Sequence, residues 1–169
     1  FQYDKAPVPS PIVLFQPLLQ LTKLEWIVEK CTELGVTTFV FYPAQRGELK
    51  ELSPSKQERL QRIMQAGVKQ SGNLWMPEIK ITLPIEKWEK SSLSLYVALP
   101  ESTLYLSSFS PLSPEKGIGF LIGPEAGFSE KEKEHLQKLD AIAFRLSPYI
   151  LRTETASITA ISQAICLRK

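Results

Sequence analysis

Two charged residues near the end of the chain stand where charge is costly unless it is paired or used. Arg152 and Glu154 separate a segment with strand-like alternation, residues 141–146, from residues 155–167, which include no charged side chain. A cation and a carboxylate held between buried elements could stabilise an anion and accept a proton. Arg152 could equally form an ion pair, with Glu154 or with Glu125, that only holds the loop in place. The sequence leaves both hypotheses open.

A second loop, at residues 123–127, could bind a ligand through its main chain. Residues 118–122 form a short apolar run, and the loop Gly-Pro-Glu-Ala-Gly at 123–127 follows it directly. Glycines in such a loop let a flat ligand approach the backbone closely. Because ligands of open α/β sheets bind at loops that leave the carboxyl ends of strands, this loop and the one after Leu146 are expected to share a pocket. Without further information, the same residues would also make a plain strand-to-helix turn.

Hydrophobic spacing predicts the elements that must position these loops. Strand-like runs occur at 11–15, 37–42, 75–81, 93–99, 118–122 and 142–146, and helical spacing occurs at 22–34, 55–72, 130–139 and 153–167. A short helical turn at 85–88 and a long loop at 102–115 are also expected. Capping boxes predict the starts of three helices, at Thr22 with Glu25, Ser55 with Glu58 and Ser129 with Glu132. The alternation of strands and helices predicts an α/β fold, with a mostly parallel sheet flanked by helices.

Composition narrows the class of protein. The chain has 169 residues, enough for about one domain, and its hydrophobic content of 43% and charged content of 22% are typical of a soluble globular protein. No apolar run approaches the length of a membrane span. Cys31 and Cys166 lie on apolar faces of predicted helices, so both are expected to be reduced core residues in a cytoplasmic protein. The net charge of +2 decides little about nucleic acid, and two cysteines with one histidine make a metal site unexpected.

Two motifs together resemble the paired signature of a known enzyme family. Residues 121–129, Leu-Ile-Gly-Pro-Glu-Ala-Gly-Phe-Ser, and 150–156, Ile-Leu-Arg-Thr-Glu-Thr-Ala, resemble those of the RsmE family of bacterial 16S ribosomal RNA methyltransferases, in the SPOUT superfamily. A third block agrees, Glu-Lys-Cys-Thr-Glu-Leu-Gly-Val at 29–36 with Pro43, Arg46, 58–59, 70–72 and Pro77 following it. The three blocks span most of the chain in the order that the family has.

The resemblance implies a fold and an assembly that pattern alone does not. The spacing of the elements predicts an ordinary doubly wound sheet, whereas members of this family tie their C-terminal part into a deep trefoil knot. Residues 11–169 would form the SPOUT methyltransferase domain. Residues 1–10 would be the remnant of a linker from an N-terminal RNA-binding domain that this sequence does not include. The family is homodimeric, and the uncharged last helix fits burial against a partner subunit.

The resemblance also implies the chemistry, which is transfer of a methyl group from S-adenosylmethionine to N3 of a uridine in 16S ribosomal RNA of the small subunit. Arg152 would stabilise the anion or position the uridine, and Glu154 would act as a base or orient Arg152. Cofactor-binding positions are Leu99, Pro100, Glu101, Ile122, Gly123, Pro124, Glu125, Gly127, Leu146, Ser147, Ile150, Leu151, Thr155 and Ala156. RNA-binding positions are Lys23, Lys30, Arg46, Arg59 and Gln70.

Some positions depart from the family's pattern and keep other functions open. Ala126 and Ser147 stand where glycine is usual, Tyr149 where a basic residue is common, and Asn73 where arginine is common. Ala126 is expected to be tolerated if its φ is negative. The alternatives are a related knotted methyltransferase that acts on transfer RNA or another ribosomal RNA base, and an RNA-binding or ribosome-assembly module with weak catalysis. Binding of S-adenosylmethionine discriminates between the enzyme and the module.

Overall fold

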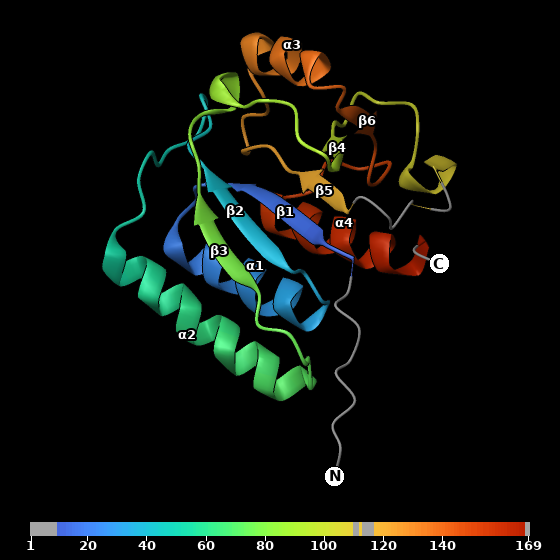
Figure 1. The fold of residues 1–169 in the computed structure, drawn as a ribbon. Coiled ribbons are helices and arrows are strands. Elements are labelled where there is room, and N and C mark those ends of the chain that lie inside the picture. Colours follow the sequence, from blue (N-terminus) through green and yellow to red (C-terminus); the bar gives the residue numbers. More distant parts are fainter. Residues whose placement is uncertain (1–9, 110–111, 113–116, 168–169) are drawn as a thin grey trace.

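The computed structural model describes residues 10–109, 112 and 117–167, in which strands and helices alternate (Figure 1). The expected linker at 1–10 therefore lies almost wholly outside the described residues. The strands are β1 (Ile12–Pro17), β2 (Thr38–Tyr42), β3 (Glu78–Ile81), β4 (Ser94–Ala98), β5 (Ile118–Leu121) and β6 (Ile142–Phe144). The α-helices are α1 (Leu21–Glu33), α2 (Pro54–Ser71), α3 (Glu130–Lys138) and α4 (Thr153–Leu167), and the 3-10 helices are η1 (Ile85–Lys87) and η2 (Leu106–Phe109).

All six strands form one sheet, in the order β3-β2-β1-β5-β4-β6, and every pair of neighbours is parallel. This confirms the predicted α/β class with a parallel sheet flanked by helices. The register aligns Val97 of β4 with Leu121 of β5, and Ala98 with Phe144 of β6. The loops after these three strands therefore leave the sheet side by side. Passage of the C-terminal part through an earlier loop stays a prediction.

Side-chain alternation along the strands divides the core between the two faces of the sheet. Leu14 and Phe120 belong to a large cluster that includes buried residues of α1, α2 and α4, whereas Leu121 belongs to a smaller cluster with Leu136 of α3. Figure 1 shows the same division, with α3 beyond one face of the sheet and α1, α2 and α4 on the opposite face. Near-continuous apolar strands are what a sheet covered on both faces requires.

Only one of the three predicted capping boxes forms. At α3, the hydroxyl of Ser129 accepts a hydrogen bond from Glu132 N, and the Glu132 carboxylate accepts one from Ser129 N. The predictions for α1 and α2 were wrong, because these helices begin one residue earlier, after Gln20 and Ser53, without a side-chain cap. Proline suits the first turn of a helix, so Pro54 already belongs to α2.

The two cysteines differ in their surroundings. Cys31 is buried in the core, and burial raises the pKa of its thiol. Cys166 is exposed, so the prediction that it belongs to the core was wrong. It lies beside exposed Ile165 on a face of α4 that the described part of the chain leaves open, while Ala160 and Ile161 face the core. None of the helices described is both long and apolar enough to span a membrane.

Glu132 is a buried carboxylate that joins distant parts of the chain. One oxygen, Oε2, accepts the hydrogen bond from Ser129 N at 2.7 Å, and the other, Oε1, accepts one from Gln45 N at 2.8 Å. The side chain is fully buried, yet both oxygens have donors and the start of a helix favours negative charge. Glu132 therefore ties the loop after β2 to α3, and with it the loop that precedes α3.

Replacing Glu132 with alanine is expected to lower the free energy of unfolding by about 3 kcal/mol, because it leaves the buried N–H of Ser129 and the part-buried N–H of Gln45 without an acceptor. Urea denaturation measures the change. The matched control is Glu134→Ala, two residues along the same helix at an exposed position, which is expected to stay within about 0.5 kcal/mol of the wild type. Equal effects of the two substitutions would contradict this role of Glu132.

Candidate functional site

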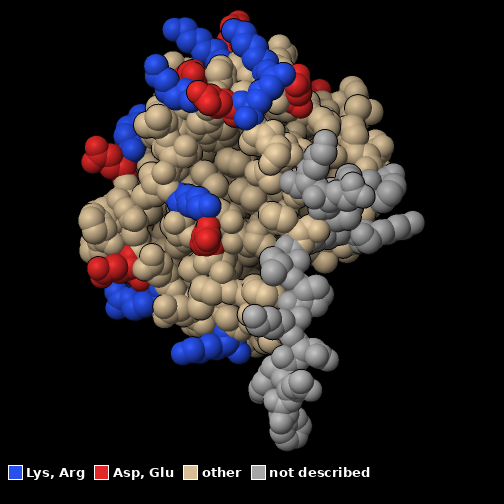
Figure 2. All heavy atoms as spheres, viewed as in Figure 1, with Lys and Arg blue, Asp and Glu red and all other residues tan. Residues whose placement is uncertain are grey.

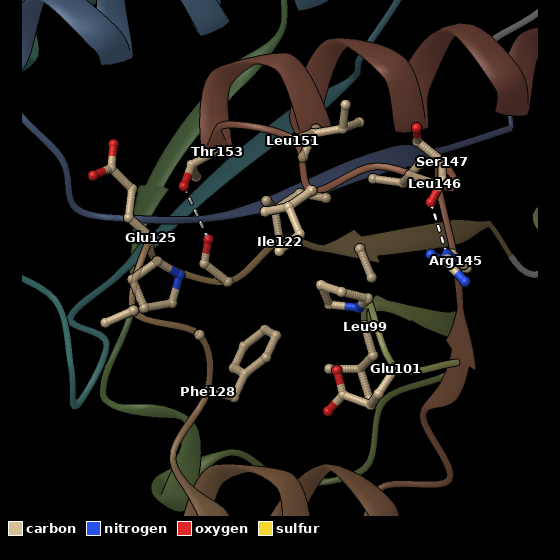
Figure 3. A pocket seen from close by; sticks show the side chains of 18 of the residues that line it. Leu99, Glu101, Ile122, Glu125, Phe128, Arg145, Leu146, Ser147, Leu151 and Thr153 are labelled. Atoms are coloured by element: carbon tan, nitrogen blue, oxygen red, sulfur yellow. Dashed lines mark hydrogen bonds between the residues drawn. The ribbon is translucent and has the colours of Figure 1, made fainter. Parts of the chain in front are cut away.

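A cavity of about 350 Å³ opens at the carboxyl edge of the sheet, between the loops that follow β4, β5 and β6 (Figure 3). Glu101 lies on the side of Leu99, and Glu125 lies on the side of Thr153. Backbone and apolar side chains make most of the wall. Its lining residues are Arg46, Ala98, Leu99, Pro100, Glu101, Ile122, Gly123, Pro124, Glu125, Ala126, Gly127, Phe128, Lys133, Arg145, Leu146, Ser147, Tyr149, Ile150, Leu151, Thr153 and Ala156.

The structure brings together at this cavity every residue predicted to bind cofactor except Thr155. Thr155 is exposed on the first turn of α4, whereas Thr153 and Ala156 line the cavity. The reason is helical geometry, since residues three apart share a face and adjacent residues do not. The shared pocket of two loops is thus found as expected, while the part that each residue takes in binding stays a prediction.

The loop at 123–127 is shaped by two glycines. Gly127 has a φ of +70°, which strains other residues, and its N–H donates to the carbonyl of Pro124 at 2.8 Å. A Cβ at Gly123 would lie 2.9 Å from the ring of Phe128, so this position admits only glycine without movement of the ring. Ala126 does not have a positive φ, which meets the condition stated for its tolerance. The hydroxyl of Thr153 donates to the carbonyl of Gly123 at 3.4 Å.

The loop after β6 accommodates the other departures. Ser147 has no positive φ, and its hydroxyl accepts a hydrogen bond from Tyr149 N at 3.1 Å. Serine therefore fits here without backbone strain. Arg145 lines the cavity and donates to the carbonyls of Ser147 and Pro148. Sequence reasoning missed Arg145, although a charged residue at the end of an apolar strand and beside a predicted ligand loop is a usable signal.

An ion pair between Lys133 and Glu101 lies in one wall of the cavity. Lys133 Nζ lies 2.7 Å from Glu101 Oε1, and this hydrogen bond lowers the pKa of Glu101 and raises that of Lys133. Lys133 belongs to the alternating Glu-Lys run at 130–134 of α3, a pattern that predicts a solvent-facing helix. The prediction was wrong for Glu132, which is fully buried, and for Lys133, because the start of α3 lies beside the loop after β4 and turns Lys133 toward the cavity.

The charges at the start of α4 do not form the ion pair that the sequence left open. Arg152 is exposed, does not line the cavity and has no ion-pair partner in the described part of the chain. Glu125 instead pairs with Lys23 of α1, which lowers the pKa of Glu125, and the positive charge of Arg152 adds to this effect. Glu154 is partly buried, and its Oε2 atom has no hydrogen-bond partner among the described residues. Neither residue lines the cavity or forms an ion pair with another described residue, and both flank Thr153, which does line the cavity.

The predicted RNA-binding residues divide into two sets. Lys23 reaches the loop at 123–127, and Arg46 lines the cavity and donates to the carbonyl of Ala126 at 3.3 Å. The structure does not bring the others to the cavity: Lys30 pairs with Glu29 and Glu33 and covers the ring of Trp26, Arg59 pairs with Glu25, and Gln70 is exposed near the end of α2. On the face in Figure 2, charges of both signs are mixed over α3, without a basic stripe.

An all-parallel sheet whose carboxyl edge holds a backbone-lined cavity defines an α/β protein of the class that binds nucleotide-like ligands between its strand-end loops. Comparison with known proteins identifies the family. Residues 6–165 match the model of the RNA methyltransferase domain. Ribosomal RNA small subunit methyltransferase E of Bacillus subtilis (strain 168) is 33% identical over 94% of this chain and 67% of its own length. The chain belongs to the RNA methyltransferase domain family and, within it, to the group of these methyltransferase E proteins, as its motifs predicted.

Solved structures agree with this assignment. A Legionella pneumophila methyltransferase in complex with SAM superposes with a TM-score of 0.84 at 26% identity, covering 94% of this chain and 66% of its own. The ribosomal RNA small subunit methyltransferase E of Neisseria gonorrhoeae, bound to S-adenosyl methionine, has a TM-score of 0.83 at 26% identity over 95% of this chain and 67% of its own. The chain thus spans about two thirds of the length of these relatives.

Replacing Lys133 with methionine is expected to raise the pKa of Glu101 toward its ordinary value, because the hydrogen bond from Lys133 is the main cause of the lowering. NMR titration of the carboxyl carbons measures it. A carboxylate whose pKa is lower in the folded than in the unfolded state stabilises the folded protein at pH values above the unfolded-state pKa. This stabilisation is lost as the pH falls through the folded-state pKa. The stability difference should therefore vanish in acid, and at neutral pH it should stay below about 1 kcal/mol for this exposed pair.

The control for this substitution is Lys131→Met, which removes an exposed lysine of the same helix. It should leave the titration of Glu101 in place. An unchanged Glu101 pKa in Lys133→Met would show that the ion pair does not form in solution.

Proposed function

We propose that this chain is an S-adenosylmethionine-dependent methyltransferase that methylates N3 of a uridine in 16S ribosomal RNA, within the cytoplasmic small ribosomal subunit. One observation carries the proposal. Both motifs of the family signature, at 121–129 and 150–156, contribute to the wall of a single cavity. Relatives of the same group bear the name of this activity, and solved relatives hold S-adenosyl methionine.

The residues present suit this cofactor. A cavity of about 350 Å³ lies within the usual range for small-ligand sites, and its apolar side chains and exposed main chain suit an adenosine. Residues of the three loops would hold the cofactor, with Glu101 placed to accept hydrogen bonds from a ribose. When bound, the cofactor supplies a methyl group on a positively charged sulfur.

The remaining chemistry is assigned to the start of α4. Attack by N3 of a uridine requires loss of its imide proton, and negative charge then spreads onto the flanking carbonyl oxygens. Arg152 has no ion-pair partner among the described residues, so its guanidinium is available to stabilise that charge. Glu154 has an oxygen that no described residue hydrogen-bonds, which suits it to accept the proton or to orient Arg152. Arg46, which lines the cavity, and Lys23, which pairs with Glu125 of the lining, are the residues proposed to contact RNA.

We also propose that the chain works as a homodimer. The outer face of α4 bears exposed Ile165 and Cys166 but no charge between Thr155 and Leu167. An uncharged helix face with a large exposed apolar side chain is suited to burial against another subunit.

The first test is titration calorimetry of S-adenosylmethionine into the purified chain, followed by methylation of small ribosomal subunits that lack this modification. Saturable binding and N3-methyluridine in the digested 16S RNA, detected by mass spectrometry, are expected. Methylation of transfer RNA instead would favour the related enzyme. A folded chain that binds no cofactor would favour the RNA-binding or assembly module.

Replacing Arg152 with alanine is expected to lower the rate of transfer about a hundredfold or more, because removal of one donor to a developing oxyanion has an effect of this order. Cofactor affinity should stay at the wild-type value, since Arg152 does not line the cavity. Single-turnover methylation and calorimetry measure the two quantities. Normal methylation by this variant would refute the assignment of Arg152.

Replacing Ile165 with glutamate is expected to convert the dimer to a monomer, because it would place a charge in the proposed interface. Light scattering coupled to size-exclusion chromatography measures the mass. Leu83→Glu is the control, since Leu83 is exposed on the loop after β3 and far along the chain from α4. A monomeric wild type, or a dimer that tolerates Ile165→Glu, would contradict the proposed interface.

A further inference from the structure

We propose that Arg145 is a positioning residue that holds the loop at 146–150 in the conformation that binds the cofactor. Gln163 contributes a further hydrogen bond to the same loop. This inference rests on the proposed function for the identity of the ligand. The role of Arg145 itself rests on contacts within the chain and concerns residues outside the motifs that identify the family.

The guanidinium of Arg145 donates hydrogen bonds to two consecutive carbonyl groups of the loop. Arg145 Nε donates to the carbonyl of Ser147 at 2.8 Å (Figure 3), and Nη2 donates to that of Pro148 at 2.7 Å. Gln163 Nε2, from α4, donates to the carbonyl of Leu146 at 3.1 Å. Side chains of the same chain thus occupy three successive carbonyl oxygens of the loop. A charged fork with two parallel hydrogen bonds fixes direction better than a single donor does.

Arg145 is itself well anchored. Its N–H donates to the carbonyl of Leu104 at 2.7 Å, and Arg145 forms an isolated parallel bridge with Tyr105. It directly follows Phe144, the last residue of β6, whose carbonyl accepts a hydrogen bond from Leu99 N. The guanidinium therefore connects the loop at 146–150 to the edge of the sheet.

The loop needs such a connection because packing does little for it. Tyr149 is 79% exposed and Ile150 is 87% exposed, so two of its largest side chains bury little apolar surface. Segments with few buried apolar contacts open easily. In this chain polar contacts from Arg145 and Gln163 therefore do the ordering, and a loop ordered in advance binds with less entropic cost.

Arg145→Met keeps an unbranched side chain and removes both hydrogen bonds. It is expected to weaken binding of S-adenosylhomocysteine about tenfold in calorimetry, which corresponds to about 1.4 kcal/mol. The KM for S-adenosylmethionine should rise by a similar factor, while kcat and the KM for RNA stay within about twofold, because Arg145 acts on the cofactor loop alone. Arg145→Lys keeps the charge but not the two-donor geometry of the guanidinium. Its affinity for S-adenosylhomocysteine should lie between those of Arg145→Met and the wild type.

Hydrogen exchange separates this role from a general loss of stability. In the free protein, Arg145→Met should speed exchange at the amides of residues 149–151 and leave the strands of the sheet unchanged. Arg62→Met is the matched control, because Arg62 is exposed on α2 and does not line the cavity. It should change neither the exchange nor the affinity.

Three results decide the proposal. Unchanged exchange at 149–151 in Arg145→Met overturns it, and so does wild-type affinity for S-adenosylhomocysteine in that variant. Faster exchange throughout the sheet with unchanged affinity of the folded fraction would show a merely structural role. If the wild type binds no S-adenosylhomocysteine, the proposed function fails, and exchange in the free protein alone then decides whether Arg145 orders the loop.

Discussion

The hydrogen-bonded register of β4, β5 and β6 is the constraint on which the site depends. Because these strands are parallel and end together, the three loops that follow them must leave at one place, whatever their sequences. The sheet determines where a ligand can bind, and the loops determine which ligand. Glycine at 123 and 127 and the turn at 147–150 then contribute to a wall lined mostly by apolar residues.

Charged side chains that bind main-chain groups give this wall its shape. Glu132 accepts hydrogen bonds from two N–H groups and joins the loop after β2 to the residue that precedes α3. Arg145 donates hydrogen bonds to two carbonyls of the loop after β6. Lys23 adds a tie from α1 to Glu125. The partners lie in or beside the loops that line the cavity, whereas Arg152 and Glu154 have no such tie to another described residue. The structure thus separates residues that build the site from residues free to act in it.

Hydrophobic periodicity and turn residues were sufficient to predict the class of fold and the six strands, because these depend on local sequence. The shared pocket followed from the general rule that ligands bind beyond the carboxyl ends of parallel strands. Details that depend on tertiary neighbours were not predictable in this way. The caps expected at Thr22 and Ser55 were wrong, because the helices begin at Leu21 and Pro54 instead. Lys133 looked like one more solvated lysine of a charged helix, and only the neighbouring Glu101 gives it a place at the cavity. The same holds for the exposure of Cys166, which depends on what covers α4.

The ties around the cavity also bear on how the chain folds. Glu132 meets Gln45 across 87 residues, and Lys23 meets Glu125 across 102 residues, so the site is assembled from segments far apart in sequence. Contacts of such long range form slowly, since the chain must first close large loops. During synthesis on the ribosome, the first half of the chain emerges with Gln45 and Lys23 lacking the partners that they have in the finished site. The cavity is therefore expected to appear late, only after the last strand and helix are in place, and a partly folded chain would have no means of holding the cofactor.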